Sequence, residues 1–562
     1  MTAHALDEPT TLTFTGERMV PHASDIFTEL FHWQRYLYFR PWYEGRRIVD
    51  AASGEGYGTS YIANFAEDAI GLEIAADAIA HARQKYPKPR FVQGDVCDYD
   101  YSDAEVVLSF ETIEHLENPE TFLKALKSCP GTIAISTPNR ETYSLGNEAT
   151  DKPLNPFHTI EWSCSEFVDL IRSHFTGRKV EFLSQQAAWP GTIRPGVDEN
   201  CAFIIAVIGP IAKNLKAALP IPAWPRLGVS VPTHNGSIRC RDLVVGMTRY
   251  YPGDLKFAIV DNASRHVEAL ALDQLHQDFA THVDVLHLTG NVGYGIGANT
   301  GLDFLWQQEW FDYFCVSNDD VLPAVDCLSQ MVCAMKELDE GGHKPGVIGP
   351  VTNSISGAQK VDVGLYQSYA QMIDFAELWH RDHHSIVTQV NQLRGLFMLI
   401  HPDCLSAIGG FDPLFGIGNF EDDDYNLRTR FAGFTTWIAE GAFLHHAGSS
   451  TFGEMKVDYE ASITRNLQLI CEKWGFADFN EFVTISEKPK DVKLYVPLRS
   501  SIDMSGYVIT LGTGEHIDLI RQASDVEFAA YIHNRMQGRP REERIAIIEL
   551  LEKTARSSEH AA

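Results

Sequence analysis

Two groups of polar side chains, about a hundred residues apart, have the composition of a cation site. The first is the run Asn419–Asp424, which holds four adjacent carboxylates and precedes His445 and His446. Adjacent carboxylates repel one another, so a fold keeps them together where a cation, a proton or a polar ligand compensates. The second group, Ser317–Asp320, follows the apolar run Tyr313–Val316. Together they suit a divalent cation that holds a diphosphate, with one carboxylate acting as a base. An ordinary acidic helix start is the alternative.

A third set of acidic residues follows successive apolar runs nearer the N-terminus. Asp50 precedes a glycine-rich segment with Gly54 and Gly56, where glycine permits a positive φ and close approach of the backbone to a ligand. Glu73 ends the next apolar run, and Asp95 follows the third. Residues that follow parallel strands lie together at the carboxyl edge of an open α/β sheet, where ligands bind. The carboxylate of Glu73 is suited to accept hydrogen bonds from the hydroxyls of a ribose. The pattern predicts a nucleoside pocket.

Short β-rich runs separated by helix-length segments must position these residues. The runs are 47–50, 69–73, 90–92, 105–108, 132–135, 180–183 and 202–207 in a first series, and 227–231, 257–260, 283–286 and 313–316 in a second. Alternation of this kind is typical of parallel, doubly wound sheets. We expect an α/β protein with two doubly wound, Rossmann-like domains and a mixed, mainly helical C-terminal tail.

Proline density marks the boundary between the two series. Pro210, Pro220, Pro222 and Pro225 disfavour helices and strand ladders, which predicts a linker over residues 213–225. The other boundaries follow: a first domain over 1–212, a second over 226–480, and an extension over 481–562 that ends in a charged helix over 541–556. We expect the two domains to fold independently, because each contains a complete αβ series.

Composition narrows the class of protein. A hydrophobic content of 44% over 562 residues is enough to bury more than one core, and a formal charge of −29 argues against a nucleic-acid partner. The 10 cysteines include no C-x-x-C pair, which fits free thiols in a reducing compartment. With no signal peptide or membrane-spanning run in the sequence, we expect a cytoplasmic protein and leave peripheral association with the inner face of a membrane open.

Several motifs of the first series occur together in one enzyme family. They are Thr15–Arg18, the glycine loop, Ser109–Leu116, Ser136–Asn139 and Asn155–His158. Over about 200 residues the chain resembles the class I S-adenosylmethionine-dependent methyltransferases. The resemblance implies the class I methyltransferase fold, with Gly54 and Gly56 at the methionine end of the donor, Glu73 at the ribose and Asp95 at the adenine. Ala52 departs from the family, in which many members carry glycine.

Methyl transfer to a hydroxyl requires an aligned nucleophile and a base. His115 and His158 are our candidates for that base. Either histidine could instead be a packed or loop-stabilising side chain. Glu111 and Glu114 could equally orient the acceptor.

The second series carries separate motifs of another family. They are Val229–Asn235, Val260–Ser264, Asn291–Asn299, Ser317–Asp320, Arg394–Ile400 and the acidic run. Over about 230 residues the chain resembles family 2 glycosyltransferases of the GT-A fold. The resemblance implies a nucleotide-sugar donor, with these residues in the nucleotide site: Thr233, Asp261, Asn291, Gly293 and Asn299.

The same resemblance assigns roles to the acidic groups. Asn318 and Asp320 take the place of the metal-binding D-x-D motif, and Asn318 offers only an uncharged oxygen to Mg²⁺ or Mn²⁺. His445 would be a third ligand, with His446 as the alternate and a packed strand-end histidine as the ordinary interpretation. Asp422 would be the catalytic base and Glu421 would support it, while Asp424 could cap the helix.

These assignments predict a bifunctional enzyme of surface glycan biosynthesis. It would add a sugar with inversion to a glycan or lipid-linked glycan and would methylate a glycan hydroxyl. A glycan-binding or scaffolding protein with one inactive domain is the alternative, and Ala52 and Asn318 favour it. A methyltransferase that acts on a non-glycan substrate is the third hypothesis, because acceptor pockets are built from loops without a general code. The oligomeric state is not predictable from the sequence.

Overall fold

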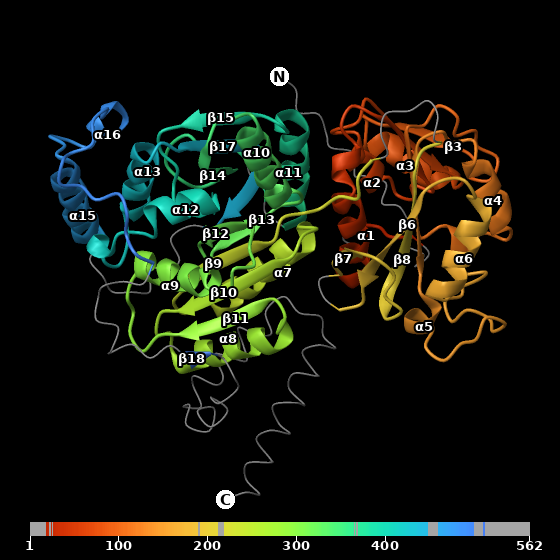
Figure 1. Cartoon of the computed structure of the whole chain (residues 1–562), viewed down its shortest axis with the longest axis horizontal. Coiled ribbons are helices and arrows are strands. Elements are labelled where there is room, and N and C mark those ends of the chain that lie inside the picture. Colours follow the sequence, from red (N-terminus) through yellow and green to blue (C-terminus); the bar gives the residue numbers. More distant parts are fainter. Residues whose placement is uncertain are drawn as a thin grey trace, which may run out of the picture.

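The computed structural model describes residues 18–21, 24, 26–188, 191–211, 219–364, 366, 369–447, 459–498 and 510–511. Most of the Thr15–Arg18 motif and the expected helix over 541–556 lie outside the described residues, so the mainly helical tail stays a prediction. Figure 1 shows two α/β halves side by side, with the first half in red to yellow and the second in green to blue.

The first half is built on an eight-stranded sheet in the order β3-β2-β1-β4-β5-β8-β6-β7. Strands β3 to β5 pair in parallel, and β8, β6 and β7 add antiparallel. The strands are β1 (Arg47–Ala51), β2 (Asp68–Glu73), β3 (Arg90–Gln93), β4 (Val106–Phe110), β5 (Thr132–Pro138), β6 (Val180–Gln186), β7 (Ile193–Pro195) and β8 (Cys201–Ile208). The doubly wound first domain expected from the sequence is confirmed.

Helices flank this sheet and are set by local sequence signals. Asn118 caps α4, and Ser163 with Glu166 forms a capping box at the start of α6. The helices are α1 (Ile26–Tyr38), α2 (Tyr57–Ile62), α3 (Ala76–Lys85), α4 (Pro119–Leu126), α5 (Arg140–Tyr143) and α6 (Cys164–His174), with short 3-10 helices η1 (Arg40–Trp42) and η2 (Ile113–His115).

The second half contains a ten-stranded mixed sheet in the order β13-β17-β14-β16-β12-β9-β10-β11-β18, with β15 paired to β17. Its parallel centre is β12, β9, β10 and β11. The strands are β9 (Leu227–Thr233), β10 (Leu255–Asp261), β11 (Val283–His287), β12 (Tyr313–Ser317), β13 (Val321–Pro323), β14 (Pro345–Thr352), β15 (Val387–Val390), β16 (Phe397–Ile400), β17 (Thr435–His446) and β18 (Thr510–Leu511).

Helices again accompany the sheet of the second half. Tyr459–Trp474 of α15 packs its apolar face, through Ile470 and Trp474, on Phe415 and Leu427. The helices are α7 (Ser237–Tyr250), α8 (His266–Asp278), α9 (Tyr294–Trp306), α10 (Cys327–Glu340), α11 (Tyr369–His383), α12 (Pro402–Ile408), α13 (Glu421–Phe431), α15 (Tyr459–Trp474) and α16 (Glu481–Thr484), with η3 at Pro413–Phe415. In the described part of the chain, no helix combines the length and apolarity needed to cross a bilayer.

Helix α1 joins the two halves through buried polar contacts. The side-chain amide of Gln34 donates to the backbone oxygens of Thr248 (2.9 Å), Arg249 (3.2 Å) and Tyr251 (3.0 Å) at the end of α7. Glu29, also on α1, forms an ion pair with Arg249. In Figure 1, α1 lies on the side of the first half that faces the second. The amide of Gln34 therefore satisfies carbonyls that a helix leaves without intrahelical partners.

Apolar contacts and a buried ion pair extend this interface. Arg40 Nε lies 3.3 Å from Asp326 Oδ2, and Trp42 Nε1 donates to the oxygen of Pro220 at 2.8 Å. Trp224, within the predicted linker, donates to the oxygen of Tyr38. A single cluster of buried apolar side chains contains residues of both halves. The halves thus share packed surface, and the independent folding of the two domains stays a prediction.

Candidate active sites

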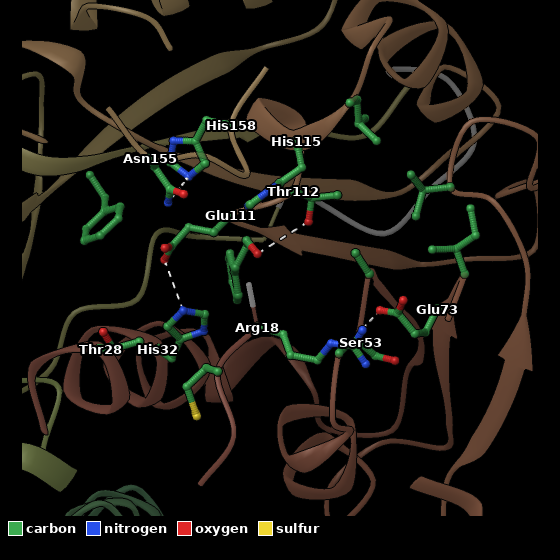
Figure 2. Close-up of a pocket in the computed structure, with 18 of the residues that line it drawn as sticks. Arg18, Thr28, His32, Ser53, Glu73, Glu111, Thr112, His115, Asn155 and His158 are labelled. Carbon is green, nitrogen blue, oxygen red and sulfur yellow. Dashed lines mark hydrogen bonds and ion pairs between the residues drawn. The ribbon is translucent and has the colours of Figure 1, made fainter. Parts of the chain in front are cut away.

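The carboxyl edge of the first sheet opens into a cavity of about 1110 Å³. A volume of this size holds a drug-sized ligand with room beside it. Figure 2 shows Ser53 and Glu73 on one side of the cavity and His115 and His158 on another. The cavity thus has a nucleoside side and a histidine side.

Glu73 and the glycine loop form the nucleoside side. Glu73 Oε2 accepts from the backbone N–H of Gly54 at 3.0 Å, and Oε1 accepts from that of Ala75 at 2.9 Å. Asp95 lines the same cavity and is exposed, with Oδ1 accepting from the N–H of Cys97. The structure therefore brings Gly54, Glu73 and Asp95 together, as the sequence predicts.

Asp50 and Gly56 lie behind this loop, outside the lining of the cavity. Asp50 is buried and accepts from Thr59 Oγ1 at 2.6 Å and from Tyr36 Oη at 3.0 Å, and burial raises its pKa to about 6. A Cβ on Gly56 would lie 2.9 Å from Ala82 Cβ, and its φ is +101°. Both residues therefore shape the loop, so the contact with a donor predicted for them is indirect. Ala52 has a φ of +65°, a conformation that favours glycine.

The histidine side combines two imidazoles with a buried carboxylate. The rings of His115 and His158 meet edge to face with centroids 4.8 Å apart. His158 Nδ1 donates to Glu161 Oε1 at 2.6 Å, and His115 Nδ1 donates to the oxygen of Phe157 at 3.0 Å. Glu114 is fully buried, which raises its pKa to about 8. The candidate base residues are thus oriented by acceptors at Nδ1.

Helix α1 contributes residues to this cavity that the sequence analysis missed. His32 lines it, with Nε2 at 3.5 Å from Glu111 Oε1, and Arg35 forms a buried ion pair with the same carboxylate. These interactions turn Glu111 toward α1 rather than toward the two histidines. The only available signal was an amphipathic pattern over 26–38, which does not specify a partner.

In the second half, both acidic groups meet at the segment Arg394–Leu396. The N–H of Asn318 donates to the oxygen of Leu396 at 2.9 Å, and the N–H of Gly395 donates to Asp422 Oδ2 at 2.9 Å. Tyr294 donates to the oxygen of Gly395, and its pKa is raised far by burial and by the charges of carboxylates from both groups. Residues a hundred positions apart thus form one site.

Asp422 differs from its neighbours in the acidic run. It is half-buried, whereas Glu421, Asp423 and Asp424 are buried. Asp423 pairs with Arg394, and Asp424 accepts from Arg428 at 2.8 Å and from Trp474 Nε1 at 2.9 Å. These two carboxylates are therefore structural. Asp424 does not cap the helix, as the alternative had it, but forms an ion pair with Arg428 within the helix.

Glu421 precedes Asp422 and is more deeply buried. Its Oε2 is buried and has no hydrogen-bond partner among the described residues. Burial, reinforced by the charge of Asp422, raises its pKa to about 8. A carboxylic acid at neutral pH can donate a hydrogen bond but is a poor base, so the geometry favours the supporting role predicted for Glu421.

Asp320 and His446 form the other side of this site. His446 Nε2 lies 3.4 Å from Asp320 Oδ1, an ion-pair distance, and that oxygen has no hydrogen-bond partner in the described part of the chain. Burial alone would raise the pKa of Asp320, but the adjacent His446 outweighs it and holds the pKa below its usual range. His445 instead bonds Tyr366 Oη at 2.6 Å. The structure thus favours the alternate, His446, over His445 beside Asp320.

The predicted nucleotide residues end β9 and β10. Thr233 Oγ1 donates to Asp319 Oδ2 at 2.6 Å. Asp261 Oδ2 accepts from His287 Nδ1 at 2.8 Å, and His287 Nε2 donates to Asp273 Oδ1 at 2.9 Å. Burial would lower the pKa of His287, but the two carboxylates raise it to about 9. A protonated His287, which the sequence analysis missed, therefore fixes Asp261.

The glycine-rich turn before α9 is fixed mainly by backbone geometry. Asn291 Oδ1 accepts from the N–H of Gly293, whose φ is +84° and whose added Cβ would lie 2.2 Å from the oxygen of Gly416. Asn299 is buried, donating to the oxygen of Phe411 and accepting from its N–H. Asn299 thus orders the Phe411 loop through both ends of its amide, and the nucleotide contact expected for it stays a prediction.

Comparison with known families matches both halves. The family described as "Methyltransferase domain" matches residues 49–129, and "Glycosyl transferase family 2" matches residues 229–393. The chain therefore carries a methyltransferase domain and a family 2 glycosyltransferase domain, and the two resemblances drawn from the sequence are confirmed.

Individual relatives are described as methyltransferases. A probable S-adenosylmethionine-dependent methyltransferase of Mycobacterium tuberculosis is 36% identical over 170 residues, which cover 29% of this chain and 61% of that protein. A similarly described protein of Mycolicibacterium smegmatis is 35% identical over 29% of this chain and 65% of its own length. The match thus spans less than two thirds of either relative. The solved methyltransferase domain of a bacterial Hen1 protein is 20% identical, covering 33% of this chain and 100% of that domain, with a TM-score of 0.28.

Proposed function

We propose that this chain is a bifunctional transferase of surface glycan biosynthesis. It transfers a sugar from a nucleotide-sugar donor with inversion, and it methylates a glycan hydroxyl from S-adenosylmethionine. The observation that supports the proposal most directly is the convergence of Asn318 and Asp422 on the segment Arg394–Leu396, together with a separate nucleoside cavity in the methyltransferase domain. Two separate sites in one chain suit two successive modifications of one acceptor.

In sugar transfer, Asp422 takes the proton of an acceptor hydroxyl while that oxygen attacks the anomeric carbon. The hydrogen bond from Gly395 orients the carboxylate, and partial exposure leaves it accessible to an acceptor. A bound Mg²⁺ or Mn²⁺ would neutralise charge on the departing nucleoside diphosphate. Asp320, with a buried oxygen that lacks a hydrogen-bond partner among the described residues, fits such an ion, with Asn318 and His446 adjacent to it.

Asp320→Ala should weaken donor binding and remove its dependence on the cation. Loss of a charged ligand removes an interaction of about 1.5–3 kcal/mol, so we expect a roughly ten- to hundredfold loss of affinity. Calorimetric titration of nucleoside diphosphate with and without Mn²⁺ measures it. Asp339→Ala, on the exposed face of α10, is the matched control. Equal cation dependence in the Asp320 variant and the parent would contradict the assignment.

In methyl transfer, Glu73 and the glycine loop hold the nucleoside of the donor. Glu73 fixes the loop through the N–H of Gly54 and presents its carboxylate to the ribose. The bound donor supplies an electrophilic methyl group on a sulfonium. His115 and His158 face the acceptor side of the cavity and are the candidates for taking the hydroxyl proton.

Glu73→Ala should weaken S-adenosylmethionine binding by roughly ten- to hundredfold, because a charge-assisted hydrogen bond of about 1.5–3 kcal/mol is lost. Calorimetry on the full-length chain measures the change. Glu67→Ala, an exposed acid just before β2, should bind normally. Unchanged affinity in the Glu73 variant would show that the donor does not bind here.

The proposal as a whole is tested on the glycan itself. Mass spectrometry compares glycan from cells with and without the gene, and from cells that carry either the Glu73→Ala or the Asp422→Asn variant. We expect the gene deletion to remove one sugar and one methyl group. The Glu73→Ala variant should remove the methyl group, and the Asp422→Asn variant should remove the sugar. A deletion that changes neither would refute the glycan role.

A further inference from the structure

Two cysteines that are distant in the sequence meet in the core of the methyltransferase domain. Cys164 is the first residue of α6, and Cys201 is the first residue of β8. Their sulfur atoms lie 3.6 Å apart, and both side chains are 0% exposed. Because the sulfur atoms of a disulfide are about 2.05 Å apart, an approach of about 1.5 Å would join them.

The two thiols differ in reactivity. The hydrogen bond from Cys164 lowers the pKa of Cys201, against the opposing effect of burial. The same hydrogen bond, together with burial, raises the pKa of Cys164. Since the thiolate is the nucleophilic form of cysteine, Cys201 is the sulfur that reacts first with an electrophile. Cys164 is then in position to attack the modified Cys201.

An exposed turn lies directly beside the pair. The N–H of Cys201 donates to the oxygen of Asp198 at 3.0 Å, and Cys164 Sγ lies 3.7 Å from that same oxygen. Val197 and Glu199, on either side of Asp198, are exposed. Exposed turns open locally at a small cost in free energy, so a small oxidant can reach the two sulfur atoms without unfolding of the domain.

We propose that Cys164 and Cys201 form a redox-active pair that hydrogen peroxide oxidises to a disulfide. The Cys201 thiolate attacks one peroxide oxygen, the O–O bond breaks, and the departing hydroxide takes up the thiol proton, which leaves a sulfenic acid and one water. The sulfur of Cys164 then attacks the sulfur of Cys201, the S–O bond breaks, and a second water leaves with the proton of Cys164. Reduction by two molecules of a low-molecular-weight thiol restores both cysteines and leaves the disulfide of that thiol.

The backbone of Cys201 is connected to the wall of the methyltransferase cavity. Its oxygen accepts from Thr142 Oγ1 at 2.7 Å and from Asn139 Nδ2 at 3.1 Å. Thr142 lines the cavity, as do Ala202 and Phe203, which follow Cys201 in β8. Closing the disulfide therefore shifts this part of the wall.

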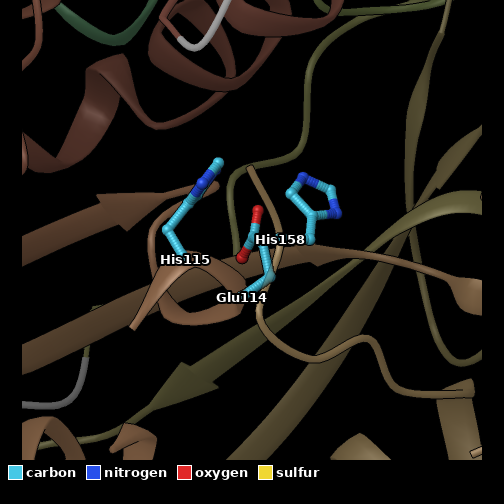
Figure 3. A group of neighbouring side chains, drawn as sticks. All are labelled: Glu114, His115 and His158. Carbon is cyan, nitrogen blue, oxygen red and sulfur yellow. The ribbon is translucent and has the colours of Figure 1, made fainter. Parts of the chain in front are cut away.

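Cys164 is connected to the histidine side of the same cavity. Helix α6 follows the loop that carries His158, and Figure 3 shows the carboxylate of Glu114 between the imidazoles of His158 and His115. The effect on catalysis rests on the proposed methyl transfer. A displacement of about 1 Å can cost about a hundredfold in rate, so we expect the disulfide to slow methyl transfer by roughly ten- to hundredfold. Donor binding at Glu73, on the nucleoside side, should change little.

Peptide mapping of the full-length chain tests the disulfide directly. The reduced chain is exposed to hydrogen peroxide, alkylated and digested with trypsin. Because trypsin does not cleave before proline, the two cysteines fall in separate peptides, 141–172 and 180–213, each with a single cysteine. We expect these peptides to be cross-linked and to separate after treatment with dithiothreitol. Absence of the cross-link, or a sulfinic or sulfonic acid in its place, would overturn the proposal.

Cysteine variants test the order of the two steps. In Cys164→Ala the sulfenic acid on Cys201 should persist and be trapped by dimedone, whereas Cys164 in Cys201→Ala should be labelled far less. Equal labelling of the two variants would contradict the assignment of Cys201 as the first nucleophile. Cys471→Ala, at a half-buried cysteine of α15, should form the cross-link as the parent does. Thermal melts check that each variant is folded.

The consequence for catalysis is measured separately from the disulfide. The acceptor is glycan from cells that carry the Glu73→Ala variant, which should bear the sugar without the methyl group. We expect methyl transfer to fall on oxidation, to recover on reduction and to resist peroxide in Cys201→Ala. An unchanged rate in the cross-linked chain would contradict the effect on the cavity wall. Absence of methyl transfer in both redox states would refute the proposed function, whereas the cross-link would still establish the redox pair.

Discussion

Asp422→Asn should reduce sugar transfer by about 10²–10⁴-fold, because loss of a general base costs this much while the shape of the side chain is kept. Asparagine still accepts from the N–H of Gly395, so the helix start and the adjacent segment should be retained. Initial rates with saturating nucleotide sugar measure the change. Cation-dependent donor binding and methyl transfer to a supplied acceptor should stay close to the parental values.

Asp403→Asn provides the matched control for this prediction. Asp403 lies in the first turn of α12 with its side chain 80% exposed, outside both candidate sites. It should transfer sugar at the parental rate. If Asp422→Asn does the same, the acidic run is only a helix start, and the base has to be sought elsewhere around Arg394–Leu396.

Arg40→Met should destabilise the full-length chain by about 3–5 kcal/mol, the usual cost of removing one partner of a buried ion pair. Arg40 lies in the first half and Asp326, which is fully buried, in the second. The guanidinium also lies over the ring of Phe65 and 2.8 Å from Cys333 Sγ. Methionine keeps much of the packing volume but leaves the carboxylate without its cation. Thermal and urea unfolding of the whole chain measure the loss.

The double variant Arg40→Met with Asp326→Asn is the companion experiment. It removes the uncompensated charge, so it should recover most of the stability lost in the single variant. Arg90, whose side chain is 62% exposed, can be replaced by methionine as the control for lost charge. Unchanged unfolding in Arg40→Met would mean that the interface contributes little and that the two halves are held only by the connecting segment.

The sequence predicted both αβ series, because alternation of β-rich runs and helix-length segments is a local pattern. The seven runs of the first series each became a strand of one sheet. It also predicted that Glu73 and Asp95 share an edge, since parallel strands place their carboxyl ends together. The predicted domain boundaries stay predictions, and the packing of Trp224 against Tyr38 shows that the proline-rich segment is no simple spacer.

The sequence by itself determined which residue types were available for chemistry and on which strand ends they stand. Only the tertiary structure decided which of them face a ligand, because burial and partner choice depend on elements distant in the chain. Within the acidic run, Arg394, Arg428 and Trp474 engage Asp423 and Asp424, which leaves Asp422 accessible. Likewise, the side chain of Asn299 is hydrogen-bonded to the backbone of Phe411, and Asp320 forms an ion pair with His446 rather than with His445. Such contacts join residues through space, and no local periodicity encodes them.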